Sequence, residues 1–368
     1  MEIGIAFIIL AGFVLINVIY YFFFAKLAFY KTPATTHSKE PLSVIVCSKN
    51  EQENLAVLVP LLLEQNYPSF EIILINDASV DNTLEVIEKF QKLDHRVKKV
   101  DVVNNESFWG NKKYGLTLGI KKAVNDRLIF IDADCKPASK DWLQHMASGF
   151  TAEKTIVLGY GAYEKKNHTI LNALIRYETG ITAIQYMSYA LHGSPYMGVG
   201  RNLGYTAQQF YDVRGFMDHM KIMGGDDDLF INQAATNRNT AIVIEPDGFT
   251  SSIPKNSWSE WWTQKRRHIN TSSHYKPKHK FLLGLFYVSQ LGFFAAAIMG
   301  FILGLNWLYI LGLVLFRYLI VWIVIGKGLS RFRESDIIPY APFLEILLVF
   351  TQLGLFFTNA GKQPQRWK

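Results

Sequence analysis

A long apolar stretch opens the chain and constrains its fold more than any other feature. Residues Ile3 to Ala25 are almost all apolar, with Asn17 as the interior exception. A helix of about 20 apolar residues crosses the hydrocarbon core of a bilayer. A cleaved signal peptide fits poorly, because the stretch is long, follows Glu2 rather than a basic cluster, and lacks a small-residue cleavage site after it. We therefore expect residues 1–30 to form a transmembrane anchor.

A second apolar region begins after Lys280. Phe281 to Leu303 and Trp307 to Ile325 each have the length and composition of a membrane span. Ile337 to Phe357 is a weaker candidate that fits a re-entrant or interfacial segment, since it contains two prolines and an acid: Pro339, Pro342 and Glu345. The sequence thus predicts a C-terminal transmembrane region, residues 281–368, of two or three helices.

The formal net charge is +7, and basic residues flank the apolar stretches. These residues are Lys26, Lys31, Lys276, Lys278, His279, Lys280, Lys327, Arg331 and Arg333. The positive-inside rule then predicts a multi-pass protein of the cell (inner) membrane with its central part, residues 31–256, in the cytoplasm. A fourth span would put the basic tail, Lys362, Arg366 and Lys368, outside, so we favour three spans. Because the bases lie where lipid headgroups would be, we expect contact with membrane lipids and no nucleic-acid binding.

Between the apolar regions, short apolar strands alternate with helical segments. The expected strands are Leu42 to Cys47, Glu71 to Asn76, Val100 to Val103 and Leu128 to Ile131, and the expected helices are Glu53 to Glu64, Asp81 to Leu93 and Asn111 to Val124. This alternation predicts an α/β domain with a mostly parallel sheet covered on both faces. Two cysteines without a Cys-x-x-Cys pair exclude a disulfide framework and fit a cytoplasmic domain.

Polar and acidic groups follow three of the expected strands. They occur in Ser48 to Glu51, in Asn76 to Ser79, and in Asp132 to Asp134. Ligands of such sheets bind beyond the carboxyl ends of the strands. Two carboxylates one residue apart repel each other unless a cation lies between them, and Mg²⁺ or Mn²⁺ takes oxygen ligands and stabilises a diphosphate leaving group. Asp81, by contrast, is expected to cap the helix that follows it.

These segments resemble successive blocks of the inverting family-two glycosyltransferases, which have the nucleotide-sugar-binding, Rossmann-like GT-A fold. The blocks are VIVCSKNEQENL, EIILINDASVDNT and IFIDADCKP, and the similarity extends over about Pro41 to Lys280. The resemblance implies that Glu51 and Asp77 contact the uracil or ribose of a UDP sugar, and that Lys113 belongs to the nucleotide-side segment. It also implies that Asp132 lies near the ribose and the metal, and that Asp134 ligates Mg²⁺ or Mn²⁺. Asn76 stands where the family often has an Asp.

A second acidic block, GGDDDLFINQAA, covers Gly224 to Ala235. The helix dipole favours acids in the first turn of a helix, which explains one or two of them but not easily three. An inverting transfer needs a carboxylate that takes the proton of the acceptor hydroxyl. By resemblance to the family's Gly-Glu/Asp-Asp-x-x-Leu block, this base is Asp227 when the block is aligned on Gly225 and Asp226 when it is aligned on Gly224. We favour Asp227.

The segment WSEWWTQKRRH, within residues 257–280, resembles the Gln-x-x-Arg-Trp signature of membrane polysaccharide synthases such as those of cellulose and hyaluronan. Gln264 and Arg267 match the signature, and His268 stands in place of its Trp. Arginine can bind a diphosphate with its fixed fork of donors, or it can contact lipid headgroups. The tryptophans before it favour an amphipathic helix at the membrane interface.

The sequence therefore predicts a membrane-bound, metal-dependent inverting glycosyltransferase. Its donor is expected to be a nucleoside diphosphate sugar, with UDP preferred, and its acceptor a lipid-linked or growing glycan at the cytoplasmic face. Two alternatives remain, a processive polysaccharide synthase and a catalytically silent scaffold that binds nucleotide sugar. The few spans and His268 favour a single transfer, and the retained acids argue against the scaffold.

Overall fold

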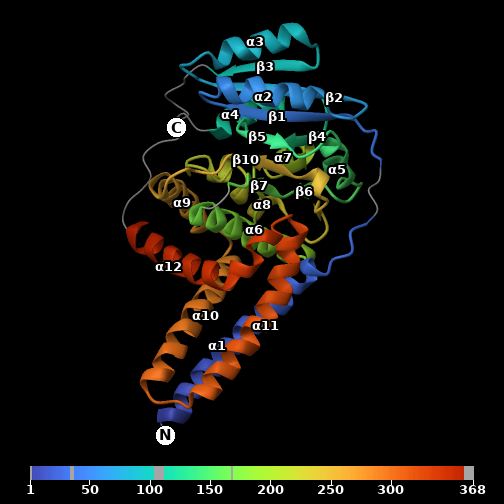
Figure 1. Cartoon of the computed structure of the whole chain (residues 1–368). Coiled ribbons are helices and arrows are strands. Elements are labelled where there is room, and N and C mark those ends of the chain that lie inside the picture. The colour runs from blue at the N-terminus through green and yellow to red at the C-terminus, as the bar shows by residue number, and fades with distance from the viewer. Residues whose placement is uncertain (1, 34–36, 103–111, 167–168, 360–368) are drawn as a thin grey trace. The chain divides into compact units, whose positions relative to one another are not determined.

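The computed structural model describes residues 2–33, 37–102, 112–166 and 169–359, and the chain divides into two compact units. One unit contains most of the long apolar helices and comprises Met1–Lys31, Asn167–Ser188 and Tyr275–Lys362. The other comprises Thr32–Lys166 and Tyr189–His274, and it contains both sheets (Figure 1).

A seven-stranded sheet forms the centre of the second unit, in the order β3-β2-β1-β4-β8-β6-β9. Its strands are β1 (Leu42–Ser48), β2 (Phe70–Asp77), β3 (Val97–Val102), β4 (Arg127–Phe130), β6 (Ile156–Leu158), β8 (Leu203–Thr206) and β9 (Thr240–Ile242). The first four are mutually parallel, β8 is antiparallel to β4 and β6, and β6 is parallel to β9. The expected mostly parallel α/β sheet is confirmed. Since Ser48 pairs with Asn76 and Asp77 with Val102, β1, β2 and β3 end at one edge.

Helices cover both faces of the parallel part, which is why its strands are apolar on both sides. On one face α2 (Gln52–Leu63), α3 (Thr83–Leu93) and α5 (Trp142–Ser148) pack on alternate strand residues such as Val44 and Val46. On the other face α4 (Lys112–Lys122) lies close to the sheet. A Cβ at Gly119 would lie 2.4 Å from Ile75 Cδ1, so glycine permits this close approach. The approach places the N-terminal end of α4 near the edge at which the parallel strands end.

A small second sheet, in the order β5-β10-β7, begins directly after Asp134. It consists of β5 (Cys135–Pro137), β7 (Gly161–Tyr163) and β10 (Thr250–Ser252). The rest of this unit includes the short helices α7 (Ala207–Asp212) and α8 (Asp228–Ala234) and the longer α9 (Trp258–Ser272). The side-chain oxygen of Ser257 accepts the N–H of Glu260 and caps α9.

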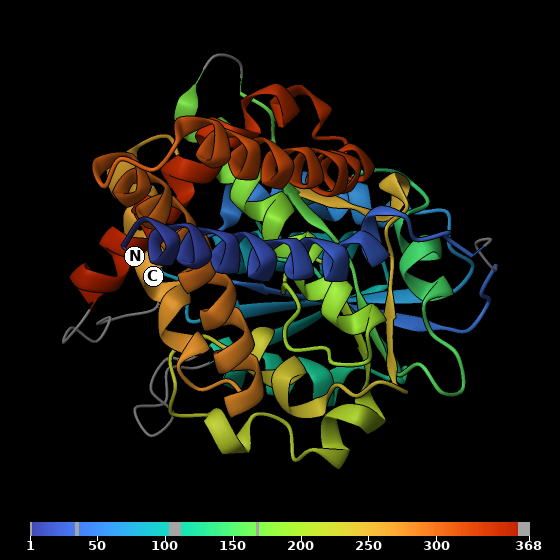
Figure 2. The same ribbon diagram turned by 90° about the horizontal axis from the view of Figure 1, so that it is seen from below.

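Four helices of the described residues are long and apolar enough to cross a membrane: Gly4–Ala28, Pro277–Ile302, Trp307–Arg331 and Ser335–Thr358. They correspond to α1 (Glu2–Ala28), α10 (Pro277–Ile302), α11 (Trp307–Arg331), and η4 (Ser335–Tyr340) with α12 (Ala341–Asn359). These four helices indicate membrane association. The first three run side by side, whereas α12 runs across their direction (Figures 1 and 2). By length and composition α12 is thus a fourth candidate, although the sequence favoured three. The basic tail used in that argument, Lys362, Arg366 and Lys368, lies outside the described residues.

The segment Asn167–Ser188, which includes most of α6 (Ile170–Leu191), groups with the apolar helices. The guanidinium of Arg176 in α6 donates hydrogen bonds to Glu334 and to Asp336, which follow α11. The predicted domain bounds had assigned this segment to the central domain, residues 31–256. Its grouping depends on a buried ion pair between residues far apart in the sequence.

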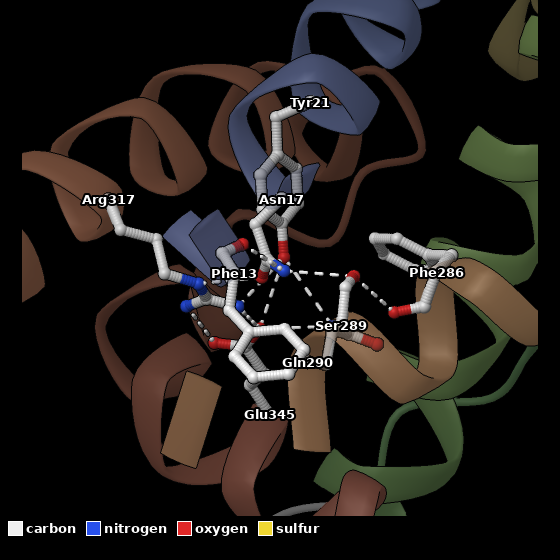
Figure 3. Close-up of polar contacts among 8 residues, drawn as sticks. All are labelled: Phe13, Asn17, Tyr21, Phe286, Ser289, Gln290, Arg317 and Glu345. Carbon is white, nitrogen blue, oxygen red and sulfur yellow. Dashed lines mark hydrogen bonds and ion pairs between the residues drawn. The ribbon is translucent and has the colours of Figure 1, made fainter. Parts of the chain in front are cut away.

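A buried polar cluster joins the four long apolar helices (Figure 3). Arg317 of α11 has no exposed surface and forms an ion pair with Glu345 of α12. Its Nε donates to Asn17 Oδ1 of α1 at 2.8 Å. Gln290 of α10 donates to Glu345 Oε1 at 3.0 Å, and Asn17 Nδ2 donates to Ser289 Oγ of the same helix at 2.9 Å. The interior Asn17 and the acidic Glu345 are therefore partners of one arginine.

Candidate active site

A pocket opens at the edge where β1 and β4 end. It is lined by Ile45, Cys47, Lys112, Leu116, Phe130, Ile131, Asp132, Gly200, Leu203, Tyr205, Asp226 and Asp227. Three of the predicted site residues, Asp132, Asp226 and Asp227, meet here although 95 residues separate the last from the first. Asp134, two positions after Asp132, is exposed to solvent.

The ammonium group of Lys112 lies between two of these acids. Its Nζ is 2.8 Å from Asp132 Oδ1 and 3.0 Å from Asp226 Oδ2. Burial opposes the charge of this lysine, but the two carboxylates raise its pKa above the ordinary value. Lys112 therefore stays charged and neutralises part of the acidic cluster.

Lys113, the residue predicted for the nucleotide side, is next to Lys112 in the sequence, but its side chain lies elsewhere. Successive residues of a helix point about 100° apart, so the two lysines cannot share one direction. Lys113 Nζ donates to the carbonyl oxygens of His219 and Ile222, at 2.6 and 3.0 Å. Burial lowers its pKa to about 8, against the opposing effect of Asp226, Asp228 and Asp227. It holds the turn that precedes the acidic block.

Asp227 is fixed by two backbone groups. The N–H of Gly200 donates to its Oδ2 at 2.7 Å, and the N–H of Asp228 donates to its Oδ1 at 2.7 Å, so Asp227 caps α8. Burial, with the charges of Asp226 and Asp228, raises its pKa to about 7, while the Gly200 hydrogen bond and Lys112 oppose the rise. A carboxyl group that titrates near neutral pH suits a general base.

Two glycines make the turn that presents the acidic block. Gly224 and Gly225 have φ angles of +76° and +77°, in the region that favours glycine. A Cβ at Gly225 would also lie 2.5 Å from Leu229 Cδ1. The turn separates the two candidates for the base, since Asp226 pairs with Lys112 while Asp227 is held by backbone N–H groups.

At the end of β2, Asp77 has the features of a ligand-binding acid. Its side chain is 3% exposed, and its buried Oδ2 has no hydrogen-bond partner among the described residues. Burial raises its pKa, against Lys49 and Lys112. A buried acceptor without a partner is costly, so a donor from a ligand would stabilise it.

The other residues on this side have partners within the protein. Glu51, at the N-cap position of α2, accepts a hydrogen bond from Asn54 Nδ2. Asn76 donates to Asp101 Oδ1 at 2.8 Å, so its side chain turns toward β3. The N-cap residue of α3 is Asn82, and Asp81, one position earlier, accepts the N–H of Thr83, the first residue of α3, at 3.0 Å.

The turn after β4 carries oxygen ligands suited to a divalent cation. Asp132 is about one-third exposed, and Asp134, two positions further along, is exposed. The described part of the chain contains no group of three or more side chains placed to hold a metal. Mg²⁺ commonly binds one or two carboxylates and completes its shell with phosphate oxygens and waters, and the same hard oxygen donors suit Mn²⁺. The two acids therefore fit a cation that arrives with a phosphate-bearing ligand.

Arg201, which is not among the predicted site residues, is a further charged residue near these acids. Burial opposes its charge, but Tyr163, Cys135, Asp134 and Asp132 raise its pKa. Its guanidinium lies 4.2 Å from the centroid of the Tyr163 ring and donates to the carbonyl oxygen of Ala162 at 3.1 Å. The signal in the sequence was its place in the Gly-rich segment just before β8.

Of the predicted residues in α9, Gln264 donates to the Tyr163 hydroxyl at 3.4 Å. The Nε of Arg267 is buried and has no hydrogen-bond partner within the described part of the protein. The side chain of His268 lies outside the described residues. Gln264 thus connects α9 to the small sheet, and Arg267 retains a buried donor.

Comparison with known proteins supports an assignment of this fold and pocket. Residues 43–203 match the family described as glycosyl transferase family 2. Poly-beta-1,6-N-acetyl-D-glucosamine synthase of Staphylococcus epidermidis is 34% identical over 123 residues, 33% of this chain and 29% of that protein. An uncharacterized glycosyltransferase of Haemophilus influenzae is 27% identical over 154 residues, 42% of this chain and 44% of that protein. The matches thus span less than half the length of either relative.

Among solved structures, the mannosyltransferase PcManGT from Pyrobaculum calidifontis, in complex with GDP-Man and Mn²⁺, is similar along nearly its whole length. The TM-score is 0.60, with 14% sequence identity, and the similarity covers 94% of this chain and 99% of that one. At this identity the likeness concerns the fold. Residues 43–203 thus match glycosyl transferase family 2, and the sheet-containing unit has the GT-A fold.

Proposed function

We propose that this protein transfers a sugar from a nucleoside diphosphate sugar to an acceptor hydroxyl, with inversion at the anomeric carbon. The observation that carries the proposal is the meeting of Asp227 with Asp132, Asp226 and Lys112 in one pocket of a GT-A fold. The glycosyltransferase names of the relatives support the reaction class. The GDP-Man and Mn²⁺ bound to PcManGT support a nucleotide-sugar donor and a metal.

In the proposed reaction Asp227 takes the proton of the acceptor hydroxyl as its oxygen attacks the anomeric carbon. Attack comes from the face opposite the nucleotide, so the configuration inverts. The Gly200 N–H donates to one carboxylate oxygen of Asp227 and so fixes the orientation of the base. Lys112 offsets part of the negative charge of Asp132 and Asp226, so a diphosphate meets less repulsion.

On the donor side, the buried Oδ2 of Asp77 would accept an N–H of the nucleobase, and Glu51 lies at the neighbouring strand end. We keep a UDP sugar as the expected donor, because the imide N–H of uracil suits this acceptor. Asp132 and Asp134 would hold Mg²⁺ or Mn²⁺, which supplies positive charge at the leaving diphosphate. Gln264 and Arg267 would bind the diphosphate, Arg267 through its buried Nε.

For the acceptor we propose a lipid-linked molecule at the cytoplasmic face of the membrane. Long apolar helices bordered by basic residues support a membrane location with the central residues in the cytoplasm. The name of the S. epidermidis relative and the Gln264–Arg267 pair support the second candidate, processive synthesis of a polysaccharide.

Release of nucleoside diphosphate by the full chain in detergent tests the proposal. UDP-N-acetylglucosamine, UDP-glucose and GDP-mannose are each supplied with Mn²⁺, with Mg²⁺ or with EDTA, and a membrane lipid extract provides acceptors. We expect metal-dependent release from one donor and its loss in Asp227→Asn. Binding of UDP without release from any donor would instead favour the scaffold, and failure to bind UDP or GDP would overturn the proposal. Product length on a gel separates a single transfer from processive synthesis.

A further inference from the structure

The third acid of the acidic block, Asp228, does not line the pocket and has a different set of contacts. It is 8% exposed, and its Oδ1 accepts the N–H of Leu229 at 2.7 Å. Its Oδ2 accepts a hydrogen bond from the hydroxyl of Thr271, which is itself 4% exposed and lies in the last turn of α9. Asp228 therefore connects the turn that carries Asp227 to a helix more than 40 residues later.

Thr271 lies on the same face of α9 as the predicted diphosphate-binding residues. Gln264, Arg267 and Thr271 follow the spacing i, i+3, i+7, which places three side chains on one stripe of a helix. The first and last are about 10 Å apart along the helix axis, at a rise of about 1.5 Å per residue. At two of these positions, Gln264 and Thr271, α9 makes polar contacts with other parts of the unit.

Each end of the stripe is attached to a different part of the site. Gln264 donates to the hydroxyl of Tyr163, whose ring lies under Arg201, and Arg201 is within the electrostatic influence of Asp132 and Asp134. Thr271 bonds to Asp228 at the other end. Arg267 lies between the two attachments, and its buried Nε lacks a partner among the residues described. The two attachments fix the rotation of α9 and so the direction of Arg267.

We propose that the hydrogen bond between Thr271 and Asp228 positions α9 so that Arg267 meets the diphosphate of the donor. Thr271 is then a positioning residue, and Asp228 joins the helix that binds the leaving group to the turn that carries the base. This inference rests on the proposed function. It also accounts for the three consecutive acids, because Asp226 pairs with Lys112, Asp227 faces the pocket and Asp228 anchors α9.

Thr271→Val tests the proposal, since valine keeps the shape and removes the hydroxyl. We expect the KM for the donor and the dissociation constant of UDP with Mn²⁺ to rise about tenfold, because a buried carboxylate oxygen loses its donor and α9 occupies the competent position less often. The kcat at saturating donor and the acid limb of the pH profile should change little. Thr271→Ser keeps the hydroxyl and should restore both constants. Thr263→Val is the matched control, because the Thr263 hydroxyl makes an exposed bond within α9, to the carbonyl oxygen of Ser259.

Hydrogen exchange of the full chain in detergent provides a readout that does not need turnover. Amides of residues 258–272 should exchange faster in Thr271→Val than in the wild type, and at wild-type rates in Thr271→Ser and Thr263→Val. Unchanged exchange together with an unchanged UDP affinity in Thr271→Val would overturn the inference. A wild-type protein that binds neither UDP nor GDP would refute the proposed function, whereas the exchange rates would still report whether Thr271 anchors α9.

Discussion

The charge of Glu345 holds the apolar unit together through Arg317, and its removal tests that packing. In Glu345→Gln the guanidinium keeps its place but loses its counter-ion. Arg317 has no exposed surface, so neither water nor a lipid headgroup reaches it in the folded state. The rings of Phe293 and Tyr318, 4.3 and 5.1 Å from its Cζ, supply only a weak substitute for the lost carboxylate.

The expected cost is about 3–5 kcal/mol, the range for removing one partner of a buried ion pair. Arg317→Met should cost a similar amount, because it leaves the Glu345 carboxylate buried with neutral donors, Gln290, Tyr21 and Tyr318, in place of a counter-ion. The double variant Arg317→Met with Glu345→Leu removes both charges. It leaves Asn17 Oδ1 without its arginine donor, at about 1–3 kcal/mol, so it should be more stable than either single variant.

These differences in stability are measured by heating the full chain in detergent and determining, by size-exclusion chromatography, how much folded protein remains at each temperature. Arg214→Met is the control, since the Arg214–Asp218 pair is exposed and should contribute about 0–1 kcal/mol. The reasoning is refuted if Glu345→Gln melts at the wild-type temperature, or if the double variant loses as much stability as the two single variants added together.

Three further results are expected. Because burial and neighbouring acids raise the pKa of Asp227 to about 7, turnover should rise with pH through 7 as the base loses its proton. Asp227→Asn should lower kcat at least about 100-fold with little effect on the KM for the donor. A flat pH–rate profile from pH 5 to 9 would contradict this. Lys112 lowers the pKa of Asp227, so Lys112→Met should move the acid limb to higher pH. Lys113→Met should destabilise the 219–222 turn and move the limb less, and pH–rate profiles and melting curves of both variants measure the difference. Gly225→Ala should lower the free energy of unfolding by about 1–3 kcal/mol, because Gly225 has a positive φ and a Cβ there would meet the Leu229 side chain. Gly312→Ala is the control and should melt as the wild type does, since nothing lies within 4 Å of a Cβ at that position. Equal melting temperatures of the two variants would argue against the described turn.

Much of the sheet-containing unit follows from local sequence. The strands β1, β2 and β4 are apolar on both faces, and this pattern requires helices on both sides wherever the strands pair. Asp77, Asp132 and Asp134 come directly after or at the end of such strands, so their common edge was predictable. The long apolar helices were predictable for the same reason, since their length and composition are properties of single segments.

The tertiary structure decided which neighbouring side chain serves the site. Lys112 and Lys113 are equivalent in sequence, and only the close packing of α4 on the sheet at Gly119 directs the first toward Asp132 and the second toward the 219–222 turn. The strands β5, β7 and β10 have three residues each, too few to show a period, and they form only because distant segments pair, with Thr250 opposite Gly161 and Pro137. The separate contacts of Asp226, Asp227 and Asp228 likewise come from distant elements.

Glu345 shows why contacts between distant elements do not follow from local sequence. Within its own segment it weakened the case for a membrane helix, because an isolated carboxylate is costly in an apolar environment. Its partner Arg317 lies 28 residues earlier and Asn17 is on the first helix, so no local pattern reveals that the charge is neutralised. Local sequence determines which segments bury apolar surface, whereas the pairing of buried charges depends on which helices meet, and only the folded chain specifies that.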